Sequence, residues 1–466
     1  MKILLIAWYF PPSNTIAAVR LGKLAKFLTS AGHDVRVLTA KGLPYAQTLS
    51  VEIPEQRIYR TDWLDINSLS TRLKSSLRRL LRRPAKLAVT PAGAVTPGAA
   101  AAPGAASIAA RKPPRGTTYF GGQASKLYQL LFNIPDKQIG WLPAARKHAM
   151  RLITEWRPDA IFASAPPFTC LLIGYLVSKA TGIPLIIEYR DRWSDDPYYP
   201  PPWWRRRLEQ WLEGKIARHA AAITTVSEPW AQTYRARYSK PVTVIYNAYD
   251  PADQPAQTTS TVSGGWPDRR ILRILHAGGI YRGRRDPSPL FAAISNDEDL
   301  KRKVRVVFYG IATDYVGSLA RDHGVEEIVE VHGRVSHAES LRQQRVSDVL
   351  LLMQMDSPLE QGNVPGKFFE YLGARRPILI LGWDQGVPAT IVKERGAGAA
   401  TTDPKTIAAQ LRAWIATKDR DGQLPDLSAS VCAGFTHQEQ AAKLENFLHD
   451  IAGPRTPATS SRTQMA

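Results

Sequence analysis

One segment of the sequence combines residues that bind a phosphate with a carboxylate placed to bind hydroxyl groups. Residues 362–377 read Gly-Asn-Val-Pro-Gly-Lys-Phe-Phe-Glu-Tyr-Leu-Gly-Ala-Arg-Arg-Pro. Glycines let backbone N–H groups approach an anion, and Lys367 adds a positive charge at the expected start of a helix. Glu370 follows about one helical turn later and suits hydroxyl groups. Phosphate with hydroxyls suggests a nucleotide sugar, and the alternative is a solvated Lys367–Glu370 surface pair.

Short apolar runs on both sides place this segment at the carboxyl edge of a predicted sheet. The runs at 349–353 and 378–381 have the composition of buried parallel strands, and such runs alternate with helical patterns along the chain. The predicted strands span 2–8, 35–39, 160–163, 185–189, 222–226 and 242–246, then one from 271, and 304–309, 328–331, 349–353 and 378–381. We therefore predict an α/β fold of two doubly wound, Rossmann-like units, with ligands at the carboxyl edges.

Length and composition predict the domain organisation. At 466 residues the chain exceeds the size at which a single core keeps growing, so two domains are expected. Ala, Pro and Gly dominate residues 84–118, which indicates a disordered insertion. The predicted order is a first domain over 1–250, a linker over 251–268, a second domain over 269–436, a helix over 437–452 that folds back, and a disordered tail over 453–466.

Cysteine usage and the apolar segments indicate a cytoplasmic protein. Cys170 and Cys432 are too few for a disulfide framework and lack metal-ligand spacing. No apolar run is long enough to cross a bilayer, and the N-terminal apolar run ends at Pro11 and Pro12 without a cleavage site, so we expect a first strand rather than a signal peptide.

The charge balance predicts an anionic partner. The net charge is +20 and the pI is about 9.9, which fits diphosphate substrates, an anionic membrane or nucleic acid. Residues 72–86 carry seven basic residues, no acid, and leucines at helical spacing. Such a helix suits an anionic membrane surface on the inner face of the cytoplasmic membrane, or it packs by its leucines with a solvated basic face. Nucleic acid is not expected, because aromatics do not interleave with the basic residues.

Several motifs resemble the family 4 glycosyltransferases of the GT-B fold. The resemblance rests on the Lys-Phe-Phe-Glu-Tyr run at 367–371, the Tyr-Phe-Pro-Pro turn at 9–12 and the strand Gly-His-Asp-Val-Arg-Val-Leu-Thr at 32–39. It implies two Rossmann-like domains that face a cleft, with a C-terminal helix crossing back. It also implies transfer of a sugar from a nucleoside diphosphate sugar to a hydroxyl acceptor, including a lipid-linked one, with retention at the anomeric carbon and without a metal or cofactor. Bacterial surface polysaccharide or glycolipid synthesis is the implied setting.

The donor-side residues lie in three predicted loops. A Gly-rich basic loop at 278–285 offers backbone donors and guanidinium groups to a diphosphate. By resemblance, Arg282, Arg285 and Lys367 stabilise the departing diphosphate where other enzymes use a metal. The other predicted donor-binding residues are Gly278, Gly279, Arg284, Gly333, Arg334, Asn363, Val364, Gly366 and Glu370.

The acceptor-side residues follow strands of the first domain. Asp191 is the candidate for contact with the acceptor hydroxyl or the reacting sugar, and Arg190 positions it or binds an acidic group. Ser13, Asn14 and Arg20 follow the first strand and complete the predicted acceptor side. An Asp-Arg surface pair is the alternative interpretation of the 190–191 dipeptide.

One position departs from the family pattern. Many members carry two glutamates eight positions apart, but position 362, eight before Glu370, is glycine, and Glu360 lies two residues earlier. Whether Glu360 replaces the missing sugar contact is open from the sequence. Two alternatives therefore remain: a nucleotide-sugar epimerase or hydrolase of the same fold, and a catalytically inactive, membrane-associated scaffold.

Overall fold

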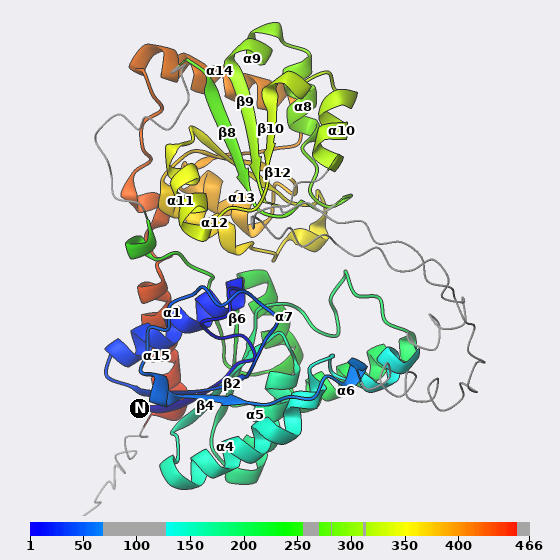
Figure 1. The fold of residues 1–466 in the computed structure, drawn as a ribbon, viewed down its shortest axis with the longest axis vertical. Coiled ribbons are helices and arrows are strands. Elements are labelled where there is room, and N and C mark those ends of the chain that lie inside the picture. The colour runs from blue at the N-terminus through cyan, green and yellow to red at the C-terminus, as the bar shows by residue number, and fades with distance from the viewer. Residues whose placement is uncertain (69–126, 255–269, 281, 311–313, 454–466) are drawn as a thin grey trace, which may run out of the picture.

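Two α/β units, one above the other in Figure 1, make up the protein in a computed structural model that describes residues 1–68, 127–254, 270–280, 282–310 and 314–453. The predicted fold class is confirmed. The predicted insertion at 84–118, the basic segment 72–86, most of the linker and nearly all of the tail lie outside the described residues.

The first unit is built on a parallel sheet in the order β3-β2-β1-β4-β5-β6-β7. Chain order reverses between β1 and β4, which makes this edge a topological switch point where ligands bind. Its strands are β1 Lys2–Ile6, β2 Asp34–Ala40, β3 Ile58–Thr61, β4 Ala160–Ala165, β5 Leu185–Tyr189, β6 Ala222–Thr225 and β7 Val242–Val244. Its helices are α1 Ile16–Ser30, α4 Leu142–Trp156, α5 Thr169–Thr181, α6 Trp203–His219 and α7 Glu228–Tyr238.

The second unit repeats this plan in the order β10-β9-β8-β11-β12-β13, again all parallel. Here the switch point lies between β8 and β11. Its strands are β8 Leu272–Ala277, β9 Val304–Tyr309, β10 Val329–His332, β11 Val349–Met353, β12 Ile378–Leu381 and β13 Gly398–Ala400. Its helices are α8 Ser288–Ser295, α9 Glu298–Lys303, α10 Asp314–Asp322, α11 His337–Val346, α12 Gly366–Ala374, α13 Val387–Glu394 and α14 Pro404–Asp421.

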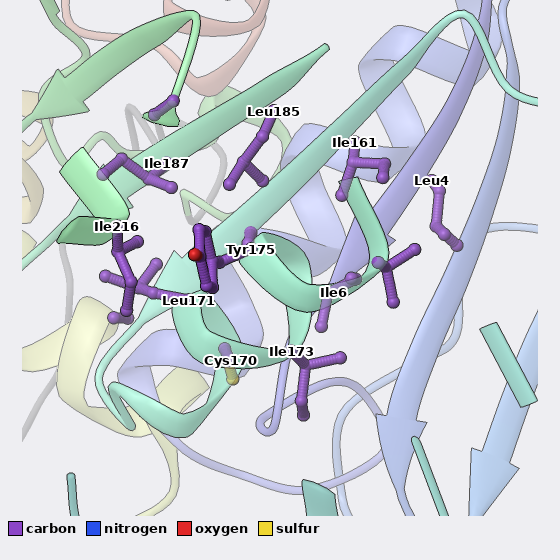
Figure 2. Packing of buried hydrophobic residues seen from close by; sticks show 14 of the residues in the cluster. Leu4, Ile6, Ile161, Cys170, Leu171, Ile173, Tyr175, Leu185, Ile187 and Ile216 are labelled. Carbon is purple, nitrogen blue, oxygen red and sulfur yellow. The ribbon is translucent and has the colours of Figure 1, made fainter. Parts of the chain in front are cut away.

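Apolar side chains on both faces of the first sheet explain why it is buried. In Figure 2, Leu171 and Tyr175 of α5 lie near Leu185 and Ile187 of β5, within one cluster of buried residues. At about 25 cal/mol per Å² of apolar surface, each such side chain contributes roughly 1.5–3 kcal/mol on burial. This packing fixes the strand ends, and therefore the loops that follow them.

The last helix, α15 His437–Ala452, crosses back onto the first unit, as the GT-B fold requires. Ala441, Leu444 and Leu448 are buried in the same cluster as Ile3 and Leu5 of β1. Figure 1 shows α15 beside α1. The first unit thus takes part of its core from the C-terminal end of the described chain.

Among the helices of the described residues, none is long and apolar enough to span a membrane.

Candidate active site between the two sheets

Loops from the carboxyl edges of both sheets touch, so the two edges face each other. The Tyr198 hydroxyl, in the loop after β5, donates a hydrogen bond to Glu360 after β11. The Arg284 guanidinium, after β8, lies 4.2 Å from the centre of the Tyr198 ring. A side chain at Gly366 would stand 3.3 Å from Ile16 after β1. The space between these contacts is where a ligand could meet residues of both domains.

The donor side begins where β8 ends in two glycines. Gly278 has a φ of +122°, and a Cβ there would lie 2.5 Å from the Lys367 Nζ, so the lysine occupies space that only glycine leaves open. Arg285 Nη1 donates to the Gly279 carbonyl at 2.8 Å. Lys367 is the second residue of α12, whose N-cap, Pro365, offers no side-chain cap. The positive end of α12 and two cationic side chains therefore converge beside this loop, as an anion site requires.

Lys367 is surrounded by protein on most sides. Burial, with Arg285 nearby, lowers the pKa of Lys367 to about 7, although Glu370 opposes the shift. Its Nζ lies 3.4 Å from His276 Nε2. An anion entering the site would restore the charged form, because an opposite charge favours the ammonium.

His276 was missed by the sequence analysis. It is fully buried one residue before the end of β8, and its Nδ1 lies 2.9 Å from the Leu351 carbonyl. Burial and then the charge on Lys367 hold the pKa of His276 well below its usual range. A neutral ring with Nδ1–H donating to Leu351 leaves Nε2 as an acceptor for Lys367. A histidine two residues before a Gly-Gly pair at a strand end was the available signal.

The three arginines of the basic loop point to three different places. Arg285 bonds to Gly279, next to the Gly278 that Lys367 Nζ faces, and its charge helps to lower the pKa of Lys367. Arg284 reaches Tyr198, as described. Arg282 lies 5.1 Å from the centre of the Tyr315 ring on α10. The structure thus brings Arg285 to Lys367, while the predicted catalytic role of Arg282 stays a prediction.

Glu370 is paired within the second domain. It accepts hydrogen bonds from His337 Nε2 at 3.0 Å and from Gln344 Nε2 at 3.3 Å. Glu370 raises the pKa of His337 above its usual value. The contact of His337 with a candidate ribose-binding carboxylate could not be predicted from the spacing of residues in the sequence. Gly333 and Arg334 are exposed just after β10.

Gly362 contacts the first domain, which explains the departure from the two-glutamate pattern. A Cβ at Gly362 would lie 2.2 Å from Trp230 Nε1 and 3.0 Å from Ser227 Oγ, so no side chain fits without moving that tryptophan. Glu360 is buried instead, and it accepts hydrogen bonds from Asn363 Nδ2 at 2.7 Å and from Tyr198. The Glu360 carboxylate thus lies where the two domains touch. Val364 is buried beside it.

On the acceptor side, a buried ion pair supports the strand ends. Glu188 at the end of β5 is fully buried and pairs with Arg20 Nη2 at 2.6 Å. Burial alone would raise the pKa of Glu188, but Arg20 and Arg190 outweigh it and hold that pKa low. Arg190 Nε donates to Ser164 Oγ at 3.0 Å. Arg20 and Arg190 thus lie beneath the site as a rigid, charged support.

Asp191 is the carboxylate that this support presents to the cleft. Asp191 is exposed to solvent, although nearby protein atoms partly desolvate its carboxylate. Burial, with Asp196 adding to it, raises the pKa of Asp191 against the opposing effect of Arg190. A carboxylate that holds a proton more readily than usual suits proton transfer with a hydroxyl group.

Ser13 and Asn14 lie in the loop after β1, at the carboxyl edge of the first sheet. Ser13 is buried and accepts from Gln47 Nε2 at 3.2 Å, and Asn14 Nδ2 donates to Thr48 Oγ1 at 2.7 Å. Ser13 also lines a pocket of about 240 Å³, together with residues that follow β1 and β2 and with Arg60 of β3. Their role toward an acceptor remains a prediction.

The prediction that no metal is needed is not tested by this geometry. Asp195 pairs with Arg192 and Arg237. Within the described part of the chain, a possible metal-ligand group, His33, Glu445 and His449, lies away from the cleft, near the amino end of β2.

The arrangement of two facing, doubly wound sheets with a C-terminal helix that returns to the first defines the GT-B fold. Similar solved structures share it over nearly their whole length. Sucrose-phosphate synthase from Thermosynechococcus elongatus is 12% identical with a TM-score of 0.60, covering 97% of this chain and 98% of its own. Anabaena HepE, solved with UDP and glucose, is 14% identical with a TM-score of 0.56, covering 97% and 100%. A Listeria monocytogenes protein described as a UDP-N-acetylglucosamine 2-epimerase is 12% identical with a TM-score of 0.51, covering 96% of each chain.

Residues 125–253 match the family model of Glycosyltransferase Family 4, the segment that carries Arg190, Asp191 and Tyr198. A comparison with curated proteins gave no significant match. The fold is shared by transferases and a protein described as an epimerase, whereas the matching family model is that of a glycosyltransferase family. The chain therefore has the GT-B fold, and residues 125–253 of its first half match Glycosyltransferase Family 4.

Proposed function

We propose that the protein transfers a sugar from a nucleoside diphosphate sugar to a hydroxyl acceptor with retention at the anomeric carbon, in surface polysaccharide or glycolipid synthesis. The observation that carries the donor assignment is the convergence of Lys367, Arg285, the Gly278–Gly279 turn and the start of α12. Retention and the pathway follow from the resemblance of residues 362–377 to the family 4 donor signature. HepE, which shares the fold, was solved with UDP and glucose.

In the proposed reaction most of the catalysis is electrostatic. Negative charge builds on the diphosphate as it departs, and cations already in place stabilise that charge without reorganising. A single well-placed donor contributes roughly 3 kcal/mol to the transition state. Lys367 and Arg285 take this role, with His276 accepting from Lys367 so that the ammonium keeps one orientation.

The sugar and the acceptor occupy the space between the two domains in this proposal. Glu370 binds the ribose hydroxyls, and Glu360 with Asn363 binds the donor sugar. Asp191 faces the acceptor hydroxyl from the first domain and exchanges a proton with it. In this proposal, Glu360 supplies the sugar contact that the glycine at position 362 cannot make.

A cytoplasmic protein at the surface of the membrane, acting on a lipid-linked acceptor, completes the proposal. The net charge of +20 favours an anionic surface. The predicted basic helix at 72–86 is one candidate for this contact.

Calorimetric binding of UDP and GDP tests the donor assignment most directly. We expect one of the nucleotides to bind, and Lys367→Ala and Arg285→Ala to weaken binding at least about tenfold, because each removes one charged contact to phosphate. Arg302→Ala, an exposed arginine on α9, is the control and should bind as the parent does. Absence of nucleotide binding by the folded protein would overturn the transferase assignment and leave the inactive scaffold.

Turnover then separates a transferase from an epimerase or hydrolase. We expect UDP or GDP release from the matching nucleotide sugar to rise when a hydroxyl acceptor is added, and Asp191→Asn to lower that rise while nucleotide binding persists. Epimerised sugar without dependence on an acceptor would instead identify the alternative enzyme.

A further inference from the structure

The outer face of α6 exposes more aromatic surface than a packed helix requires. Trp203 is 78% exposed and Trp211 is 55% exposed, with Leu208 also exposed between them. Trp203, Arg207, Trp211 and Lys215 follow at intervals of four residues, so they form one stripe along the helix. Figure 1 shows α6 at the periphery of the first unit. A tryptophan exposed to this extent is costly in water unless a partner covers it.

Most basic residues of α6 lie on its exposed face, and its acidic residues lie on its buried face. Its exposed positions include Arg206, Arg207, Lys215 and Arg218. Its two acids, Glu209 and Glu213, are both buried. Glu209 pairs with Arg205, and Glu213 accepts from the Ser194 backbone N–H at 3.2 Å. The outer face of α6 therefore carries cations and indoles but no carboxylate.

This combination matches the chemistry of a bilayer interface. Indole rings favour the level of the lipid headgroups, where one side is apolar and the other is wet. Long basic side chains place their charge toward lipid phosphates while their stems cover apolar surface. Lys215 Nζ already lies 4.7 Å from the centre of the Trp211 ring, so charge and indole form one unit. An anionic surface is complementary to such a face.

We propose that the outer face of α6 docks on an anionic lipid bilayer, with Trp203 and Trp211 at the headgroup level and Arg206, Arg207, Lys215 and Arg218 against the lipid phosphates. The helix begins directly after the loop that carries Asp191 and Tyr198. Docking therefore sets the acceptor-side loop at the membrane surface, within reach of a lipid-linked hydroxyl. Access to a lipid-linked acceptor rests on the proposed function, whereas the docking of α6 on the bilayer does not.

An apolar groove is lined in part by the segment that α6 contacts through its buried Arg205. Arg205 of α6 donates to the carbonyls of residues 129, 130 and 133, which ties α6 to that segment. A groove of about 610 Å³ lies alongside, lined among others by Trp63, Leu64, Tyr128 and Phe132. Hydrocarbon chains of the same bilayer fit an apolar lining of this kind.

Vesicle binding of the full chain tests the proposal without requiring turnover. The probes are phosphatidylcholine vesicles with and without about 30% phosphatidylglycerol, assayed by flotation. We expect binding to the anionic vesicles, and Arg207→Glu with Lys215→Glu to lower the partition coefficient about tenfold or more, since each charge contributes about 1 kcal/mol near such a surface. Trp203→Ala with Trp211→Ala should lower it as well and remove quenching of tryptophan fluorescence by brominated lipid.

Charge-matched changes elsewhere serve as the control. Arg302→Glu with Arg420→Glu alters two exposed arginines of the second domain and should leave vesicle binding nearly unchanged. All variants should have the parent's unfolding temperature and its affinity for nucleotide. Nucleotide binding therefore tests the donor assignment independently of vesicle binding. Unchanged vesicle binding in both α6 variants, or binding lost only when residues 72–86 are deleted, would overturn the proposal. Binding of α6 to RNA but not to vesicles would do the same.

Discussion

Lys367 occupies surroundings that are unusual for a lysine. Its ammonium lies between the imidazole of His276 and the space left open by Gly278. Desolvation and the nearby Arg285 make its charged form costly in the empty cleft. The protein therefore holds a cation whose charge becomes fully favourable when a diphosphate arrives.

Proton uptake on nucleotide binding should follow from this residue. With a pKa of about 7 in the empty site, Lys367 is mostly neutral at pH 8, and a bound diphosphate raises its pKa toward the ordinary value. We expect uptake of up to one proton at pH 8, measured by calorimetry in buffers of different ionisation enthalpy. Lys367→Gln should bind more weakly and without that uptake. Uptake that persists in the variant would assign the proton to another group.

At the scale of residues, the sequence pointed to Lys367 and Arg285 but not to their internal partners. Both were chosen as charges beside glycines near strand ends, and their role toward a diphosphate stays a prediction. His276 and His337 could not, because their roles depend on which strand and helix lie opposite. The lack of room for a side chain at position 362 depends on Trp230, which is more than a hundred residues away in the chain.

The elements that support the site are short strands that end in tight turns. Most predicted strands were confirmed, including 185–189, 304–309, 349–353 and 378–381 with the bounds given by the sequence. β3 Ile58–Thr61 and β13 Gly398–Ala400 were missed. Both are short outer strands of their sheets, with polar or small residues and only a few apolar positions, so periodicity gives no signal.

The conformation of the turn after β8 should depend on glycine at position 278. Gly278→Ala places a methyl group against Lys367 Nζ and a side chain at a positive φ. We expect a loss of nucleotide affinity of about tenfold or more with a modest loss of stability, because strain of this kind costs about 1–3 kcal/mol. Calorimetry and a thermal melt measure both. Gly283→Ala, also at positive φ but with open space around it, is the matched control for strain alone.

At the scale of the whole molecule, the sequence predicted two facing units but not how they touch. Strand order, with its reversal beside β1 and β8, depends on long-range pairing that no local pattern encodes. The contacts of Tyr198 with Glu360 and Arg284 likewise join loops from different domains.

Tyr198 should stabilise the closed arrangement of the two domains. Tyr198→Ala removes both the hydrogen bond to Glu360 and the ring beneath Arg284. We expect a larger radius of gyration by solution X-ray scattering without nucleotide, and a smaller difference once the nucleotide sugar is bound. Tyr199→Ala, an exposed neighbour, is the control. Equal scattering from the parent and Tyr198→Ala would contradict this role.

The first domain should depend on α15 for its stability. Removing residues 437–466 exposes the apolar surface that Ala441, Leu444 and Leu448 cover. We expect a loss of several kcal/mol, from roughly 1.5–3 kcal/mol for each large side chain, and therefore a lower unfolding midpoint in urea. Removing residues 454–466 alone is the control and should leave that midpoint unchanged.

The return of α15 also means that the chain crosses between the units twice at one place. The Tyr249 N–H donates to the Phe435 carbonyl at 3.1 Å, and the His437 N–H donates to the Tyr249 carbonyl at 2.9 Å. Two chain segments that are hydrogen-bonded to each other in this way bend easily about one axis and resist twisting. The two domains should therefore open and close about a single hinge axis. Tyr198 and Glu360 would separate on opening and form the same contact again on closing.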